Sequence, residues 1–306
     1  MQNPASFAET AMLVQQAIAQ GETQSIEYLF NRDLVTPQDG EALLDAIPAF
    51  GVDENWQKLW CASTYAFLGR RDGVTRALTD AHGPLAEKFR ALFGLAPWYA
   101  HWKTHTSTQM TWRYPQDNLP ASVAAQKAAF HALSDFFGKP LDHDILVFLW
   151  PARDEARKKL GRGLGFAIPQ YSLIHAAPDQ SPGHELAHLF AHAVPGTREK
   201  SAFVSEGVAV MLDQTGKNRV AEAKNAMARH GISAIDVAAL WQSFSSLPHS
   251  VSYPIAGLFC ARLLAAHGKS GIFELLRHPS YAEARAHFGG NLVDLVARDV
   301  EKMFQW

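Results

Sequence analysis

The chain has 306 residues, of which 47% are hydrophobic and 19% charged, and its formal net charge is −2. A chain of this length and composition folds as one large globular domain or as two ordinary ones. The near-neutral charge provides no field that attracts a polyanion, so nucleic acid is excluded as an expected partner.

Cysteines and apolar runs define the expected environment. Cys61 and Cys260 are too few for a disulfide framework and form no CxxC pair, so both are expected to be small core residues, with a single disulfide as the alternative. No apolar run is long enough to span a bilayer. The N-terminal MQNPASFAETAMLVQQ lacks the basic start and apolar core of a signal peptide. The chain as given is therefore expected to be cytoplasmic, or exported if a leader was trimmed.

Residues 1–103 are predicted to form an all-helical N-terminal region. Thr36 is a natural cap before Pro37, which suits a first helical position, and Asp53 caps the amphipathic segment ENWQKLWCASTYAFLG. The segment PLAEKFRALFGL repeats the same helical period. We expect this region to pack as short helices joined by Gly and Pro.

From residue 104 the pattern changes to a mixture of strands and helices. It predicts, in order, a strand in THTSTQMTWRY (104–114), an amphipathic helix in SVAAQKAAFHALSDFFG (122–138), a buried strand in DILVFLW (144–150), a polar helix in ARDEARKKLG (152–161) and a strand pair in GLGFAIPQYSLIHAA (163–177). From residue 181 to the end the pattern is helical. The prediction is an α+β protein whose domains are residues 1–103 and 104–306.

The segment SPGHELAHLFAH (181–192) contains the motif HExxH at His184, Glu185 and His188. On a helix, positions i and i+4 project from one face, so the two imidazoles can hold one metal ion. Ser181 is predicted to cap this helix and Pro182 to open it. His184 then lies near the positive end of the helix dipole, which favours the neutral ring that a metal requires. The alternative is a buried helix whose histidines are satisfied by hydrogen bonds.

His192 is not expected to join them. It lies about 12 Å along the helix axis from His184, too far to share an ion. The longer motif HExxHxxGxxH also fails, because Ala191 and Val194 occupy its Gly and third His positions. His192 is predicted to have a supporting or structural role.

The third ligand is expected on a second helix, SAFVSEGVAVMLD (201–213). Glu206 follows His188 by eighteen positions, enough for the chain to turn back. Gly207 costs about 1 kcal/mol in a helix relative to Ala, which suggests that backbone approaches the metal helix or the substrate there. Asp213 lies on the same face and could accept the outer N–H of a ligating histidine. The alternative is that both carboxylates are simply solvated.

HELAH followed by SEGVAVMLD resembles the gluzincin zinc peptidases, and most closely the peptidase-MA-like and aminopeptidase-N types related to thermolysin. The resemblance covers roughly residues 104–280 and includes SYPIAGLFCARLLAAHG, which is similar to the family's Tyr-led helix. It implies a zincin-like domain, with a small mixed sheet, an active-site helix and a helical C-terminal part. It implies that His184, His188 and Glu206 bind zinc and that Glu185 is the general base. The G-x-M-E-N motif of the aminopeptidases is absent, and the interval to Glu206 is one residue shorter than theirs.

Together these features predict a zinc-dependent peptidase in which Glu185 takes the proton of a metal-bound water. Tyr253 is the expected oxyanion donor, with His249, one helical turn earlier, as the alternate. A strand within GFAIPQYSLIHAA could be the sheet edge that pairs with an extended peptide or protein substrate. The rival hypothesis is a non-catalytic zincin-like scaffold that binds a partner through its helical N-terminal region, although a scaffold has no need of Glu185. Endo- versus exopeptidase action, the substrate and the oligomeric state stay open.

Overall fold

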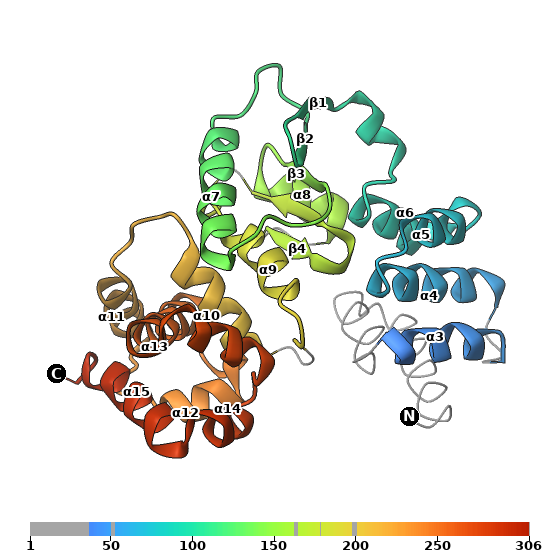
Figure 1. Cartoon of the computed structure of the whole chain (residues 1–306). Helices are drawn as coiled ribbons and strands as arrows, with labels where there is room; N and C mark the ends of the chain where they lie inside the picture. The colour runs from blue at the N-terminus through green and yellow to red at the C-terminus, as the bar shows by residue number, and fades with distance from the viewer. Residues whose placement is uncertain (1–36, 50–52, 162–164, 178, 198–200, 306) are drawn as a thin grey trace. The chain divides into compact units, whose positions relative to one another are not determined.

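The computed structural model describes residues 37–49, 53–161, 165–177, 179–197 and 201–305. In this part of the chain the architecture is α+β, mostly helical with one five-stranded sheet, as predicted (Figure 1). Contacts divide the chain into two compact units. Unit 1 comprises Met1–Pro120 and Asp144–Pro178, and unit 2 comprises Ala121–His143 and Asp179–Trp306. The sheet therefore belongs with the preceding helices by contact, while a domain boundary at residues 103–104 stays a prediction.

From residue 37 on, the described part of unit 1 starts with short helices, as the sequence predicts. They are α3 (Pro37–Ala46), η1 (Ile47–Ala49), α4 (Glu54–Phe67), α5 (Arg71–Thr79), α6 (Gly83–Leu92) and η2 (Pro97–His101). Asp53 caps α4, its carboxylate accepting from the Trp56 amide at 3.0 Å, which satisfies one of the free N–H groups of the first turn. Thr36 and the helices expected before it lie outside the described residues.

The sheet has the strand order β1-β2-β3-β5-β4 within the described residues. Its strands are β1 (Lys103–Thr106), β2 (Met110–Tyr114), β3 (Ile145–Leu149), β4 (Phe166–Ile168) and β5 (Leu173–Ala176). The segment THTSTQMTWRY, predicted as one strand, is two: Ser107 donates to the Met110 carbonyl at 2.9 Å and closes a polar turn, so β1 and β2 pair antiparallel. The inner pairs β2–β3 and β3–β5 are parallel, and β4 pairs antiparallel with β5 at an edge.

The predicted strand pair in GLGFAIPQYSLIHAA is confirmed as β4 and β5, separated by η3 (Pro169–Tyr171), and the polar helix as α8 (Arg153–Leu160). The core of unit 1 gathers on β3, whose Val147 and Phe148 are fully buried. His175 on β5 is buried there too. Its Nδ1 accepts from the Trp150 indole at 3.0 Å, so its Nε2 donates to the Leu92 carbonyl at 2.9 Å. The neutral ring therefore keeps both nitrogens satisfied.

Unit 2 is helical in the described residues. Its helices are α7 (Ser122–Phe137), α9 (His184–His192), α10 (Ala202–Leu212), α11 (Arg219–His230), α12 (Val237–Gln242), η4 (Phe244–Ser246), α13 (His249–Arg277), α14 (Tyr281–Phe288) and α15 (Gly290–Lys302). Gly138 ends α7 in the left-handed conformation, as predicted. The core is built around Phe203, Trp241 and Phe259, whose rings contact one another. Cys260 is buried in it and Cys61 packs against the core of unit 1, both as free thiols.

Two glycines allow α10 and α13 to approach closely. A Cβ at Gly207 would lie 2.8 Å from the Ala256 carbonyl oxygen and 2.8 Å from the Cys260 Sγ, and one at Gly257 would lie 2.5 Å from the Val210 side chain. The close approach expected at Gly207 is therefore real, but its neighbour is α13. The Cβ position of Gly207 therefore faces α13 and not the metal helix, and an approach of this backbone to a substrate stays a prediction.

Helix α13, the longest in the described residues, is kinked at Gly268, where φ is 64°. Its first part therefore ends at the glycine that closes SYPIAGLFCARLLAAHG. No helix in the described part of the chain combines the length and hydropathy needed to cross a bilayer.

Candidate metal centre

Helix α9 carries the HExxH motif and begins at its first histidine. Gly183 is the N-cap, with φ of 87°, and the His184 amide donates to the Ser181 carbonyl at 3.2 Å in the turn before it. The predicted start, with Ser181 as cap and Pro182 as the first helical residue, is wrong because the chain turns at Gly183. A Cβ at that glycine would lie 2.9 Å from the Ala129 Cβ on α7. A glycine with positive φ thus lets α9 start against α7.

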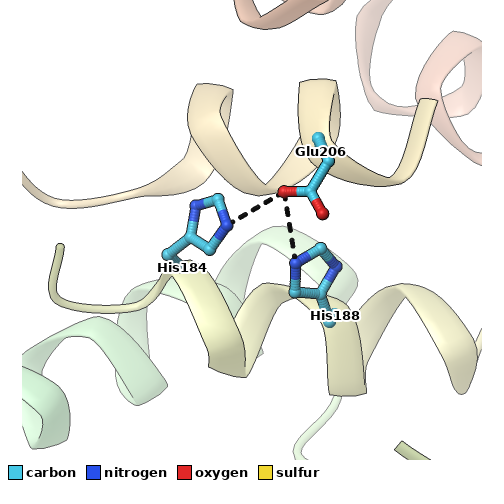
Figure 2. A group of neighbouring side chains, drawn as sticks. All are labelled: His184, His188 and Glu206. Atoms are coloured by element: carbon cyan, nitrogen blue, oxygen red, sulfur yellow. Dashed lines mark hydrogen bonds and ion pairs between the residues drawn. The ribbon is translucent and has the colours of Figure 1, made fainter. Parts of the chain in front are cut away.

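The three predicted ligands come together. Figure 2 shows the His184 and His188 rings projecting from α9 toward the Glu206 carboxylate on α10. The Glu206 Oε2 lies 3.1 Å from the His184 Nε2 and 3.7 Å from the His188 Nε2. Ligand atoms of all three residues lie within 4.8 Å of one another. The side chains are mostly shielded, at 13% exposure for each histidine and 21% for the glutamate.

These spacings suit a tetrahedral ion. With zinc bonds of about 2.0–2.1 Å, two donors of a tetrahedron lie about 3.3 Å apart. The two measured separations, 3.1 and 3.7 Å, bracket that value. Two imidazoles and one carboxylate are also the donor set of many catalytic zinc sites, which keep a fourth position open. The residues present therefore fit zinc in donor type and spacing.

The charges at the centre are strongly coupled. Burial lowers the pKa of His184, but the hydrogen bond to Glu206 and the nearby carboxylates outweigh it, so the net pKa is raised. Burial raises the pKa of Glu206, but the hydrogen bond to His184 and the charges of both histidines bring it below the ordinary value. The carboxylates thus oppose the helix dipole, which favours the neutral His184 ring. A divalent cation must displace the proton that this pair shares.

Glu185 is buried, with 8% exposure, directly beside the ligands. Burial raises its pKa, and attraction to His188 and His184 opposes that shift only in part. Its Oε1 accepts a hydrogen bond from the Gln180 side-chain amide. A buried carboxylate with a raised pKa is suited to proton transfer near neutral pH. Sequence reasoning missed Gln180, which lies in a loop without periodic signal.

Ser205 is a second residue that sequence reasoning missed. Its hydroxyl lies 3.0 Å from the His188 Nδ1, on the ring edge opposite the ligand atom Nε2. If the hydroxyl accepts from Nδ1–H, it fixes the tautomer that presents Nε2 to a metal. A signal was available, because Ser205 and Glu206 are the two polar side chains of the apolar helix AFVSEGVAVML.

Tyr253, in the second turn of α13, also lies at the centre. Its ring is parallel to that of His184, with centroids 6.2 Å apart, and a hydrogen bond from Tyr253 is among the causes that lower the pKa of Glu206. His249 is exposed and stacks on Tyr253 at 4.9 Å. The structure thus places Tyr253, the preferred oxyanion donor, beside the ligand His184. His249, the alternate donor, stacks on Tyr253.

Asp213 and His192 lie outside the group of three candidate ligands. The side chain of Asp213 is 4% exposed, and its carboxylate accepts from Arg219 at 2.5 Å and from Thr215 at 2.8 Å. Its charge contributes to the raised pKa of His184. The direct hydrogen bond to a ligating histidine stays a prediction. His192 ends α9 on an exposed face and is not part of the ligand group.

Neither the protein-family models nor the curated proteins compared with the chain match it.

Proposed function

We propose that unit 2 carries a zinc-dependent peptidase centre of the zincin-like, gluzincin type. The proposal is based on one observation: His184 and His188 on α9 and Glu206 on α10 lie at ligand spacing beside the buried Glu185. Solvated carboxylates and unrelated core histidines would not be expected to converge at ligand spacing. Zinc is the ion proposed because two imidazoles and a carboxylate suit it, whereas magnesium and calcium favour all-oxygen sites.

The roles of the side chains follow from their positions. Zinc, when bound, supplies a Lewis acid that polarises a carbonyl group and lowers the pKa of water. Glu185, held by Gln180, takes a proton from the attacking water and gives it to the leaving amine. Ser205 orients His188 through its second nitrogen. Tyr253 donates its phenolic hydrogen to the oxyanion that develops on the substrate carbonyl.

Glu185→Gln tests the proposal. The change removes the base and keeps the three ligands, so zinc content by elemental analysis should stay at the wild-type level while cleavage of a peptide library, read by mass spectrometry, should disappear. Glu155→Gln, an exposed carboxylate on α8, is the matched control and should behave as wild type.

Two outcomes would contradict the proposal. Near wild-type turnover by Glu185→Gln would refute the assigned base. A zinc-loaded wild type that cleaves no peptide pool would refute catalysis and favour the non-catalytic scaffold.

A further inference from the structure

A second cluster of potential ligands lies at the other end of α13. Glu274 and His278 stand at positions i and i+4 of its last turn and C-cap, and His287 lies in the last turn of α14. The connection between the two helices is well fixed. Ser280 and Glu283 form a capping box at the start of α14, and the Pro279 carbonyl accepts from the Trp241 indole at 2.9 Å. The three side chains therefore meet because a rigid turn brings two helix ends together.

The two carboxylate oxygens of Glu274 have different partners. Its Oε1 accepts from the Arg277 Nη1 at 2.5 Å, and Arg277 is itself held by the Pro195 carbonyl at 2.9 Å. Its Oε2 faces the histidines, 3.8 Å from the His278 Nε2 and 3.5 Å from the His287 Nε2. Arg277 thus orients the free oxygen toward both rings, as supporting residues do around metal ligands.

We propose that Glu274, His278 and His287 form a second binding site for a late first-row transition ion such as zinc or copper(II). The ligand atoms lie within 4.8 Å of one another, and both Nε2–Oε2 separations are within about 0.5 Å of the 3.3 Å that a tetrahedral zinc ion needs. Imidazole selects such ions over magnesium and calcium. The two imidazole rings lie side by side with centroids 4.4 Å apart, and His287 is exposed to solvent.

This site should be weaker than the centre on α9. Its side chains are 32–39% exposed, and the Arg277 cation beside Glu274 opposes a second positive charge. Its position suits a structural role, because an ion held there joins the end of α13 to the end of α14. An ion that binds the folded protein but not the unfolded chain raises the stability of the folded state by mass action.

Zinc titration of the metal-stripped full chain tests the proposal, with bound zinc measured by equilibrium dialysis. The wild type should bind about two ions per chain, one more tightly than the other. His287→Ala should lose the weaker one, and His230→Ala, which removes an exposed histidine of α11, should keep both. Glu206→Ala should lose the tighter one and keep the weaker.

The second site is judged by the ion that His287→Ala loses, so failure of the proposed function at the centre on α9 would not affect that result. A wild type that binds a single ion, which Glu206→Ala abolishes, would overturn the inference. A second ion that His287→Ala retains with unchanged affinity would overturn it as well. The double variant Glu206→Ala/His287→Ala should bind no zinc, and its melting temperature without metal should match that of Glu206→Ala.

Discussion

Replacing Gly207 by alanine tests how the packing of α10 on α13 supports the metal centre. The new Cβ would lie 2.8 Å from the Ala256 carbonyl oxygen and 2.8 Å from the buried Cys260 Sγ. Ordinary contacts begin near 3.4 Å, so the helices must separate by about 0.6 Å. A backbone carbonyl inside a helix cannot rotate away. The strain therefore moves α10, which carries Glu206.

The expected magnitude comes from two opposing effects. Alanine in place of glycine favours the helix by about 1 kcal/mol. Overpacking a filled core costs about 1–3 kcal/mol, and the rigid neighbours place this case at the upper end. The net loss is about 2 kcal/mol, which lowers the melting temperature of a unit of this size by about 4–8 °C. Zinc affinity should fall as well, because displacement of α10 shifts the Glu206 carboxylate from its place beside His184.

Calorimetry of the metal-stripped protein and zinc competition titrations measure the two effects. Gly40→Ala is the matched control, since its Cβ would also lie 2.8 Å from a neighbour, but that neighbour is the end of the flexible Leu68 side chain in unit 1. Gly40→Ala should leave the free energy of unfolding unchanged or raise it slightly, and it should keep the zinc affinity of the wild type. If Gly207→Ala is as stable as Gly40→Ala and binds zinc like the wild type, the packing argument is refuted.

Three further predictions concern the centre itself. Glu206→Ala should retain much less zinc than the wild type in elemental analysis, whereas His192→Ala should retain it fully. Full zinc retention by Glu206→Ala together with loss in His192→Ala would overturn the ligand assignment. Ser205→Ala should weaken zinc binding about 10–100-fold in a competition titration, because the outer nitrogen of His188 loses its partner, and unchanged affinity would count against that role. Tyr253→Phe should lower kcat about 10²–10³-fold with little change in melting temperature, and if His249→Ala has that effect instead, the two roles are exchanged.

Local sequence patterns predicted most of the described helices and strands. Asp53 predicts its helix because a cap and a helical period are both local, and Gly138 predicts the end of α7 for the same reason. HExxH spacing places two imidazoles on one face wherever the segment is helical. Errors arose where local signals compete: the polar turn after Ser107 splits a Thr-rich run into two strands, and Gly183 overrides a favourable Ser-Pro start.

The sequence alone identified His184, His188 and Glu206 as candidate ligands, because residue type and helical spacing are properties of short segments. It did not single out Glu274, His278 and His287, which meet only in the folded chain. Tertiary structure decided which of them meet. The approach of Glu206 to His184, the hydrogen bond of Ser205 to His188, and the contact of Gly207 with α13 join segments through packing that no local period specifies. Burial also belongs to the folded chain: the raised pKa of Glu185 exists only when the surrounding helices exclude water from its carboxylate.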